Sequence, residues 1–183
     1  MRRTIPLLIG LLAVAALTVL PANAAEEAYG MLYPWISPDG KRIAFSYQGD
    51  IWTVSSDGGQ ARRLTVSVAF DRSPRWSPDG SSIAFCSNRD GNYDIYVIPS
   101  IGGDAKRLTY SDANDYPGDW SPDGRKVLFT TYRHFPGSQM MEIDVETLDE
   151  RLVLWDNTSL RYARYSPDGT QIAFGRGPSS YTR

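Results

Sequence analysis

The sequence predicts an all-β fold, a β-propeller of four-stranded antiparallel blades, with about three and a half blades present as an incomplete ring. Three observations predict it: a turn motif that recurs four times, an apolar triplet after each copy, and a composition that suits strands and turns. Of the 183 residues, 16 are glycine and 12 proline, and the aromatic residues are mainly 11 tyrosines and 5 tryptophans. Many glycines and prolines indicate frequent tight turns, and Tyr and Trp favour strands over helices.

The motif Ser-Pro-Asp-Gly recurs at spacings of 40, 44 and 45 residues. Proline presets φ at its second position, Asp is tolerated at the third and Gly closes the turn, which is typical of type I. A bulky residue before the turn and an apolar triplet after it predict a β-hairpin. The repeat-defining residues are Ser37, Pro38, Asp39 and Gly40; Trp76, Ser77, Pro78, Asp79 and Gly80; Trp120, Ser121, Pro122, Asp123 and Gly124; Tyr165, Ser166, Pro167, Asp168 and Gly169.

Further alignments between the first two units give each unit four short strands. The aligned segments are Asp50-Ile51-Trp52 with Asp94-Ile95-Tyr96, Gly58-Gly59 with Gly102-Gly103, and Arg63-Leu64-Thr65 with Arg107-Leu108-Thr109. In the second unit we expect strands near Ser73–Trp76, Ser82–Ser87, Asp94–Ile98 and Ala105–Thr109. Four antiparallel strands at a period of 40 to 45 residues are typical of a propeller blade, whereas a β-sandwich repeats its turns without a fixed-period motif.

The third unit departs from this pattern. Gln139–Ile143 stands where the other units have Asp-Ile-aromatic, Glu146–Asp149 replaces the double glycine, and Tyr132–Ser138 lengthens the middle loop. These are plausible strand and turn residues, so we expect a blade with a different loop. The predicted organisation is a segment 1–24 followed by a partial propeller over 25–183, with blades at about 33–65, 73–109, 117–154 and a truncated 162–183.

The N-terminal segment predicts export. Arg2 and Arg3 precede an apolar run from Ile5 to Leu20, and Pro21–Ala25 offers small residues at the positions that a signal peptidase reads. This order is typical of a secretory signal peptide over residues 1–24. The alternative is a membrane anchor, but the run is shorter than the roughly 20 residues of a span. We expect a periplasmic or extracellular protein without stable membrane insertion after cleavage.

Charge argues against nucleic acid as a partner. The whole chain has a formal net charge of −2, and without Met1–Ala24 it carries 17 basic and 21 acidic residues. A mildly acidic chain without a basic patch does not match the electrostatic footprint of nucleic-acid binding. We therefore expect no nucleic acid as a partner.

Few residues offer catalytic chemistry. Cys86 is the only cysteine and lies in an apolar run, which favours a buried structural thiol over a nucleophile. His134 is the only histidine, so a multi-histidine metal site cannot be built, and its position in an irregular loop favours an exposed residue over a binding one. The chain has no G-x-S-x-G, Gly-rich phosphate loop, H-E-x-x-H or paired-cysteine motif. We predict no catalytic, cofactor or metal site.

The aspartates have structural explanations as well. Asp39, Asp79, Asp123 and Asp168 lie about 40 residues apart, without the dense carboxylates of a calcium loop, and turn chemistry accounts for them. Asp50 and Asp94 could contact a ligand, but we expect them to hydrogen-bond neighbouring backbone within a blade. Asp71 and Asp115 each lie five residues before a Trp, so we interpret them as repeat elements.

These units resemble the WD-like propeller repeat of TolB-type and tricorn-type proteins. The similarity covers about Tyr33 to Gly175, and the segments Tyr33–Gly40, Gly49–Val54 and Phe174–Gly177, with the tail Tyr181–Arg183, look like exported tricorn-like peptidases. The resemblance implies a substrate-gating or docking N-terminal part of a serine peptidase, with proteins or peptides as its ligands. Those enzymes carry their catalytic residues in a C-terminal domain, so none is carried over.

Two alternatives stay open under the same resemblance. One is a TolB-like envelope propeller that binds proteins without catalysis, although TolB-type proteins carry an α/β domain before the propeller. The other is a propeller that precedes a prolyl-oligopeptidase-type hydrolase. Only 14 residues follow Gly169, enough for a second strand of the fourth blade. We therefore expect either the N-terminal part of a longer protein or a truncated gene product, and an open blade edge through which copies could self-associate.

Overall fold

The computed structural model describes residues 30–134 and 137–178. The predicted signal peptide and the tail Tyr181–Arg183 lie outside these residues. Within them every regular element is a β-strand, and no helix is long and apolar enough to cross a membrane. The strands form three four-stranded sheets and one two-stranded sheet, all antiparallel, so the predicted fold class is confirmed.

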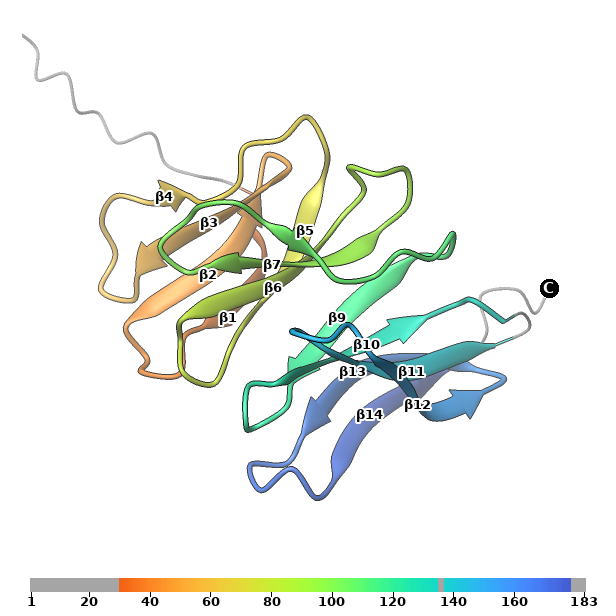
Figure 1. Ribbon diagram of the computed structural model, residues 1–183. Coiled ribbons are helices and arrows are strands. Elements are labelled where there is room, and N and C mark those ends of the chain that lie inside the picture. The colour runs from red at the N-terminus through yellow and green to blue at the C-terminus, as the bar shows by residue number, and fades with distance from the viewer. Residues whose placement is uncertain (1–29, 135–136, 179–183) are drawn as a thin grey trace, which may run out of the picture.

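The blades follow the chain in order, as Figure 1 shows. Blade 1 contains β1 (Leu32–Ile36), β2 (Arg42–Tyr47), β3 (Asp50–Ser55) and β4 (Arg62–Arg63). Blade 2 contains β5 (Asp71–Trp76), β6 (Ser82–Ser87), β7 (Asp94–Pro99) and β8 (Lys106–Arg107). Blade 3 contains β9 (Asp115–Trp120), β10 (Lys126–Thr131), β11 (Ser138–Asp144) and β12 (Glu150–Asp156). Blade 4 contains β13 (Ser159–Tyr165) and β14 (Ile172–Gly177).

In every blade the first strand lies on the side where neighbouring blades come together, which we call the inner edge. There β1 contacts β5, β5 contacts β9, and β9 contacts β13. Each inner strand pairs with the second strand of its blade through a register shift typical of a β-bulge. At the bulge Tyr33, Ser73 and Tyr162 take positive φ angles between 54° and 59°. Blade 3 has Pro117 at the equivalent position, where the ring holds φ negative.

The four Ser-Pro-Asp-Gly motifs form the same turn. In each, the Gly N–H donates to the Ser carbonyl at 2.9 Å, and the Ser hydroxyl donates to an Asp carboxylate oxygen at 2.5 to 2.6 Å. The four glycines take φ between 70° and 72°, a region that favours glycine. A Cβ on Gly80, Gly124 or Gly169 would lie 3.8, 3.7 or 3.3 Å from the Pro of the preceding blade's turn. Neighbouring turns therefore pack against each other along one rim.

The hydrophobic core lies between the blades. The first cluster joins Ala44, Ile51 and Leu64 of blade 1 to residues of blade 2, including Trp76 and Phe85. A second cluster joins blades 2 and 3, and a third, smaller one joins blades 3 and 4. The second strands of blades 2 and 3 are buried on both faces, whereas β1 and much of blade 4, at the two ends of the row of blades, are exposed. Burial of this kind explains why the second strands are nearly continuous apolar runs, for example Ile83-Ala84-Phe85-Cys86.

Candidate functional site

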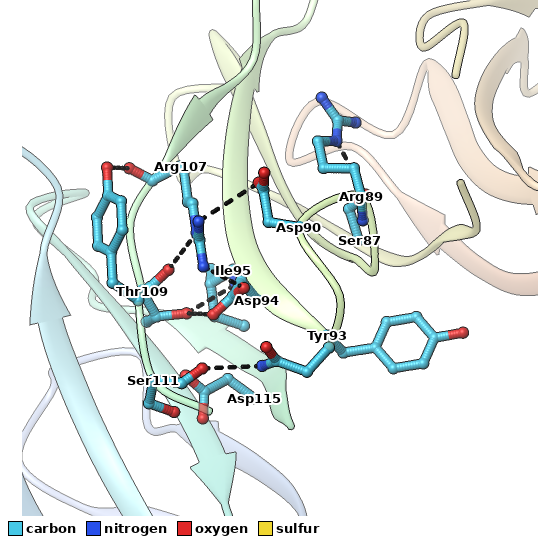
Figure 2. Close-up of polar contacts among 12 residues, drawn as sticks. Ser87, Arg89, Asp90, Tyr93, Asp94, Ile95, Arg107, Thr109, Ser111 and Asp115 are labelled. Atoms are coloured by element: carbon cyan, nitrogen blue, oxygen red, sulfur yellow. Dashed lines mark hydrogen bonds and ion pairs between the residues drawn. The ribbon is translucent and has the colours of Figure 1, made fainter. Parts of the chain in front are cut away.

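Asp94, at the start of β7, forms a side-chain cluster with Arg107 and Thr109 of blade 2, which we call the clasp. Its buried carboxylate accepts a hydrogen bond from Arg107 Nη2 at 2.7 Å and from the Thr109 hydroxyl at 3.2 Å. The Thr109 hydroxyl oxygen in turn accepts the Ile95 N–H at 2.9 Å. Figure 2 shows Arg107 between Asp90, Asp94 and Thr109. Burial raises the pKa of Asp94, and Arg107 opposes that shift. Because these contacts are all made within blade 2, the carboxylate stabilises the blade itself.

Blade 1 repeats this clasp. Asp50 pairs with Arg63, Thr65 donates to Asp50 at 3.3 Å, and the Ile51 N–H donates to the Thr65 hydroxyl at 2.9 Å. We expected neighbouring backbone to be the partner of these aspartates. Only Asp50 accepts such a bond, from the Ser67 N–H at 3.2 Å, and the other partners are Arg and Thr side chains. The reason is that the Arg-Leu-Thr segment crosses the start of the third strand in both blades.

Asp71 and Asp115 hold the loop after the second strand of their own blades. Asp71 accepts two hydrogen bonds from Arg89 Nη2, at 3.0 and 3.1 Å. Asp115 accepts one from Arg133 Nη2 at 2.8 Å, and Arg133 also pairs with Glu150. Burial raises the pKa of Asp115. Both aspartates sit at equivalent repeat positions and contact their own blade.

Cys86 and His134 lie in different blades. Cys86 is fully buried in β6, and burial raises the pKa of its thiol to about 12, so it is a thiol rather than a thiolate at neutral pH. His134 lies in the loop of blade 3, where its backbone N–H and carbonyl bond the Gln139 side chain at 3.2 and 3.1 Å. The loop borders a cavity of about 200 Å³. Among the described residues no group of His, Cys, Asp and Glu could hold a metal ion.

A cluster that the sequence did not predict lies at the inner edge, where strands of all four blades meet. Trp35 of β1 contacts two guanidinium groups: Cζ of Arg75 is 4.4 Å from the ring centroid and Cζ of Arg164 is 4.2 Å from it. Both distances are typical of cation–π contacts. Arg75 Nε donates to the Gly118 carbonyl at 2.8 Å, and Arg164 Nη1 donates to the same oxygen. We call Trp35, Arg75, Gly118 and Arg164 the inner-edge cluster.

The charges of this cluster are only partly offset by a carboxylate, that of Asp119, whose charge acts on both arginines. Within residues 30–134 and 137–178, neither Arg75 nor Arg164 forms an ion pair. The nearby Asp119 carboxylate instead accepts the N–H groups of Trp120 and Tyr165, at 2.9 and 3.0 Å. Burial, and then the charge of Arg164, lowers the pKa of Arg75 to about 10, so Arg75 remains a cation at neutral pH, and burial also lowers the pKa of Arg164. The cluster can attract an anionic group, and it holds no nucleophile or base for catalysis.

Sequence reasoning missed the inner-edge cluster because its members are different residues in each repeat. Its three side chains, those of Trp35, Arg75 and Arg164, stand one residue before the bulky residue that precedes a turn, and in blade 3 this position is taken by the neighbouring Asp119. The sequence did contain one signal of the cluster: this position differs from unit to unit, while the positions around it repeat. The variation can be interpreted only from the packing of the blades, which brings the first strands, and with them these four positions, together at the inner edge.

Comparison with known proteins fits this architecture. Tricorn protease homolog 1 of Streptomyces coelicolor is 41% identical over 54 residues, which cover 30% of this chain and 5% of that protein. The Tol-Pal system protein TolB of Anaeromyxobacter dehalogenans is 44% identical over 60 residues, covering 31% of this chain and 13% of that protein. The chain thus matches only a small part of each relative.

Structural similarity extends over more of the chain. The structure of a putative TolB from Agrobacterium tumefaciens superposes with a TM-score of 0.72 at 28% identity, covering 81% of this chain and 55% of the other. The family model described as the tricorn protease N-terminal β-propeller domain matches residues 30–179, most of the chain. This chain belongs to the family of tricorn protease N-terminal β-propeller domains.

Proposed function

We propose that this chain is an exported, non-catalytic docking part of a tricorn-like serine peptidase, where it holds or gates peptides on their way to a catalytic domain. The observation that carries the proposal is the match of residues 30–179 to the tricorn N-terminal propeller. The aspartates that the repeat shares are used inside the blades, and Cys86 is a buried thiol, which supports binding rather than catalysis.

The inner-edge cluster is the docking point in this proposal. Arg75 and Arg164 each have guanidinium N–H groups beyond those that bond backbone carbonyls. A peptide carboxylate would supply the acceptors and the negative charge that the cluster needs. Trp35 offers an apolar face beside them, which suits a ligand with both charged and apolar parts.

The experiment measures binding and hydrolysis separately. The chain is titrated with fluorescently labelled unstructured acidic peptides, and the same mixtures are analysed for cleavage products. We expect binding without cleavage, weakened at least about tenfold in an Arg75→Gln, Arg164→Gln double variant, because both charges are lost. Arg161→Gln is the matched control, since Arg161 lies on the same strand as Arg164 but is exposed. Peptide cleavage by the chain alone would overturn the non-catalytic proposal.

A TolB-like role is the second candidate function. It is favoured by the 28% identity and TM-score of 0.72 to a TolB structure. In that case the propeller would bind a folded envelope protein and leave unstructured peptides unbound. A pull-down with folded periplasmic proteins, run beside the peptide titration, separates the two candidates.

A further inference from the structure

A cavity of about 350 Å³ lies between blades 2 and 3, near the rim where the turns pack. Its lining residues include Ser82 of blade 2 and Trp120 and Gly124 of blade 3. This volume is within the usual range of small-ligand sites, about 300 to 1,000 Å³. We call it the blade 2/3 cavity.

The equivalent place between blades 1 and 2 is occupied by a side chain of this chain. Cζ of Arg42 lies 4.5 Å from the centroid of the Trp76 ring, and Arg42 Nη2 donates to the Gly80 carbonyl at 3.3 Å. Arg42 stands two residues after Gly40, at the position that Ser82 takes after Gly80. Trp76 and Gly80 correspond to Trp120 and Gly124 in the next blade.

The surroundings of the two places are alike. The indole N–H of Trp76 donates to the Trp35 carbonyl at 3.1 Å, and that of Trp120 donates to the Arg75 carbonyl at 3.0 Å, so both rings are held in the same way. On the outer side, Arg62 and Lys106 take equivalent positions. Their side chains donate to the carbonyls of Ile101 and Val145, at 2.5 and 2.6 Å. The main difference is that a serine replaces the arginine.

The third interface, between blades 3 and 4, also contains its own cation. Lys126 stands at the Arg42 position and lies 3.3 Å from Glu142, whose carboxylate also accepts the Tyr165 hydroxyl. Of the three interfaces in the described residues, two thus place a basic side chain here. The blade 2/3 interface has Ser82, whose side chain is too short to reach across.

The charge of the blade 2/3 cavity favours a cation. Three acidic residues, Asp79, Asp123 and Glu146, line it together with one basic residue, Lys106. Hydrogen bonds from Ser77 and Ser121 lower the pKa of Asp79 and Asp123, which favours the ionised form of both carboxyl groups. Lys106 is directed to the Val145 carbonyl.

We propose that the blade 2/3 cavity binds the guanidinium group of an arginine side chain from a peptide, in the place that Arg42 occupies between blades 1 and 2. The guanidinium would lie against Trp120, donate to the Gly124 carbonyl and face the carboxylates. The guanidinium site itself is inferred from this geometry. Only the assumption that a peptide supplies the arginine rests on the proposed function. The site lies apart from the inner-edge cluster and has the opposite charge preference.

The test titrates the chain with N-acetyl-arginine amide and follows the indole N–H signals of the tryptophans by NMR. We expect one site with a dissociation constant on the order of 1 mM, reported by the Trp120 indole. The uncharged isostere N-acetyl-citrulline amide should bind at least about tenfold more weakly, because it lacks the cation. Equal binding of the two probes would overturn the proposal.

Variants at two equivalent positions sharpen the test. Ser82→Arg should fill the cavity from within and weaken arginine-amide binding at least about tenfold, whereas Gln60→Arg, which places the same side chain at an exposed position of blade 1 outside the cavity, should leave binding unchanged. Arg42→Ser should open a second site and move the Trp76 indole signal on titration. Arginine-amide binding that is the same in Ser82→Arg and the parent chain would place the site elsewhere and overturn the inference.

The two proposals fail separately. If the parent chain does not bind acidic peptides, docking at the inner-edge cluster is wrong. The arginine-amide titration is unaffected by that result, because it tests a different site. If Ser82→Arg does not fold, the citrulline comparison and Glu146→Gln decide instead. Glu146 is exposed, so its substitution preserves the fold, and we expect it to weaken arginine-amide binding about threefold.

Discussion

Blades 2 and 3 hold their outer strands in different ways. In blade 2 the outer strand β8 has two residues, and the side-chain clasp of Asp94, Arg107 and Thr109 fixes the segment around it. In blade 3 the outer strand β12 has seven residues that pair along β11, and Gln139 stands where blade 2 has Asp94. A blade can therefore be closed either by a buried ionic clasp or by a backbone ladder.

The difference changes which groups carry the stability of each blade. In blade 2 much of the stability depends on one buried carboxylate, because its loss would leave Arg107 and Thr109 without their partner. The ladder distributes it over many backbone hydrogen bonds, so that no single side chain is essential. Gln139 is buried like Asp94, but its amide only fixes the backbone of the loop at His134.

Replacing the clasp carboxylate should have the largest effect. We expect Asp94→Ala to lower the free energy of unfolding by about 3 kcal/mol, because it removes one partner of a buried ion pair. Urea denaturation followed by tryptophan fluorescence measures the change. Asp104→Ala, at an exposed position in the same blade, should change stability by less than about 0.5 kcal/mol. Equal effects of the two substitutions would show that the clasp does not stabilise the blade.

A smaller loss should follow from crowding the inner strand of blade 3. A Cβ on Gly118 would meet the carbonyl oxygens of Ala163 and Leu128 at 3.1 and 3.2 Å. We expect Gly118→Ala to lower the free energy of unfolding by about 2 kcal/mol, because rigid backbone must move. Gly177→Ala is the control, since nothing lies within 4 Å of the added atom. The same urea measurement applies, and an unchanged Gly118→Ala variant would contradict the close packing of blades 3 and 4.

Truncating the residue that replaces Asp94 in blade 3 should cost less than truncating Asp94 itself. We expect Gln139→Ala to lower the free energy of unfolding by about 1 kcal/mol, the usual contribution of neutral hydrogen bonds. The Cys86 thiol offers a local readout, because its reaction with a thiol reagent requires blade 2 to open. Asp94→Ala should accelerate this reaction more than Gln139→Ala does. The reverse order would mean that blade 3 controls the opening of blade 2.

The smallest effect concerns the turns, which blades 2 and 3 share. Hydrogen bonds from Ser and backbone N–H groups lower the pKa of Asp39, Asp79, Asp123 and Asp168, the last to about 2. A lowered pKa contributes stability that is present above the unfolded-state pKa near 4 and is lost as the pH falls through the folded-state value. We expect stability to fall between about pH 4 and pH 2, and to fall less in Asp79→Asn or Asp123→Asn. Unequal effects of these two variants would show that the turns differ.

The sequence predicted the features that depend on local residue order. The turns, the second strands and the survival of blade 3 with an altered loop all follow from neighbouring residues, so they could be predicted. The partners of Asp94 could not, because Arg107 and Thr109 reach it only after the outer segment folds back over β7. The inner-edge cluster was out of reach for a similar reason, since Trp35, Arg75 and Arg164 come from three blades. The change from Arg42 to Ser82 was visible in the repeat, but its consequence depends on which neighbouring blade that position faces.

The Gly118 carbonyl has a consequence for the order in which the molecule assembles. Every sheet pairs only strands that are consecutive in the chain, so each blade can form from local contacts. The Gly118 oxygen is different, because it gains its two guanidinium partners only when blades 2 and 4 both lie beside blade 3. One backbone oxygen thus joins three blades, and its two hydrogen bonds can be complete only after all three have packed together.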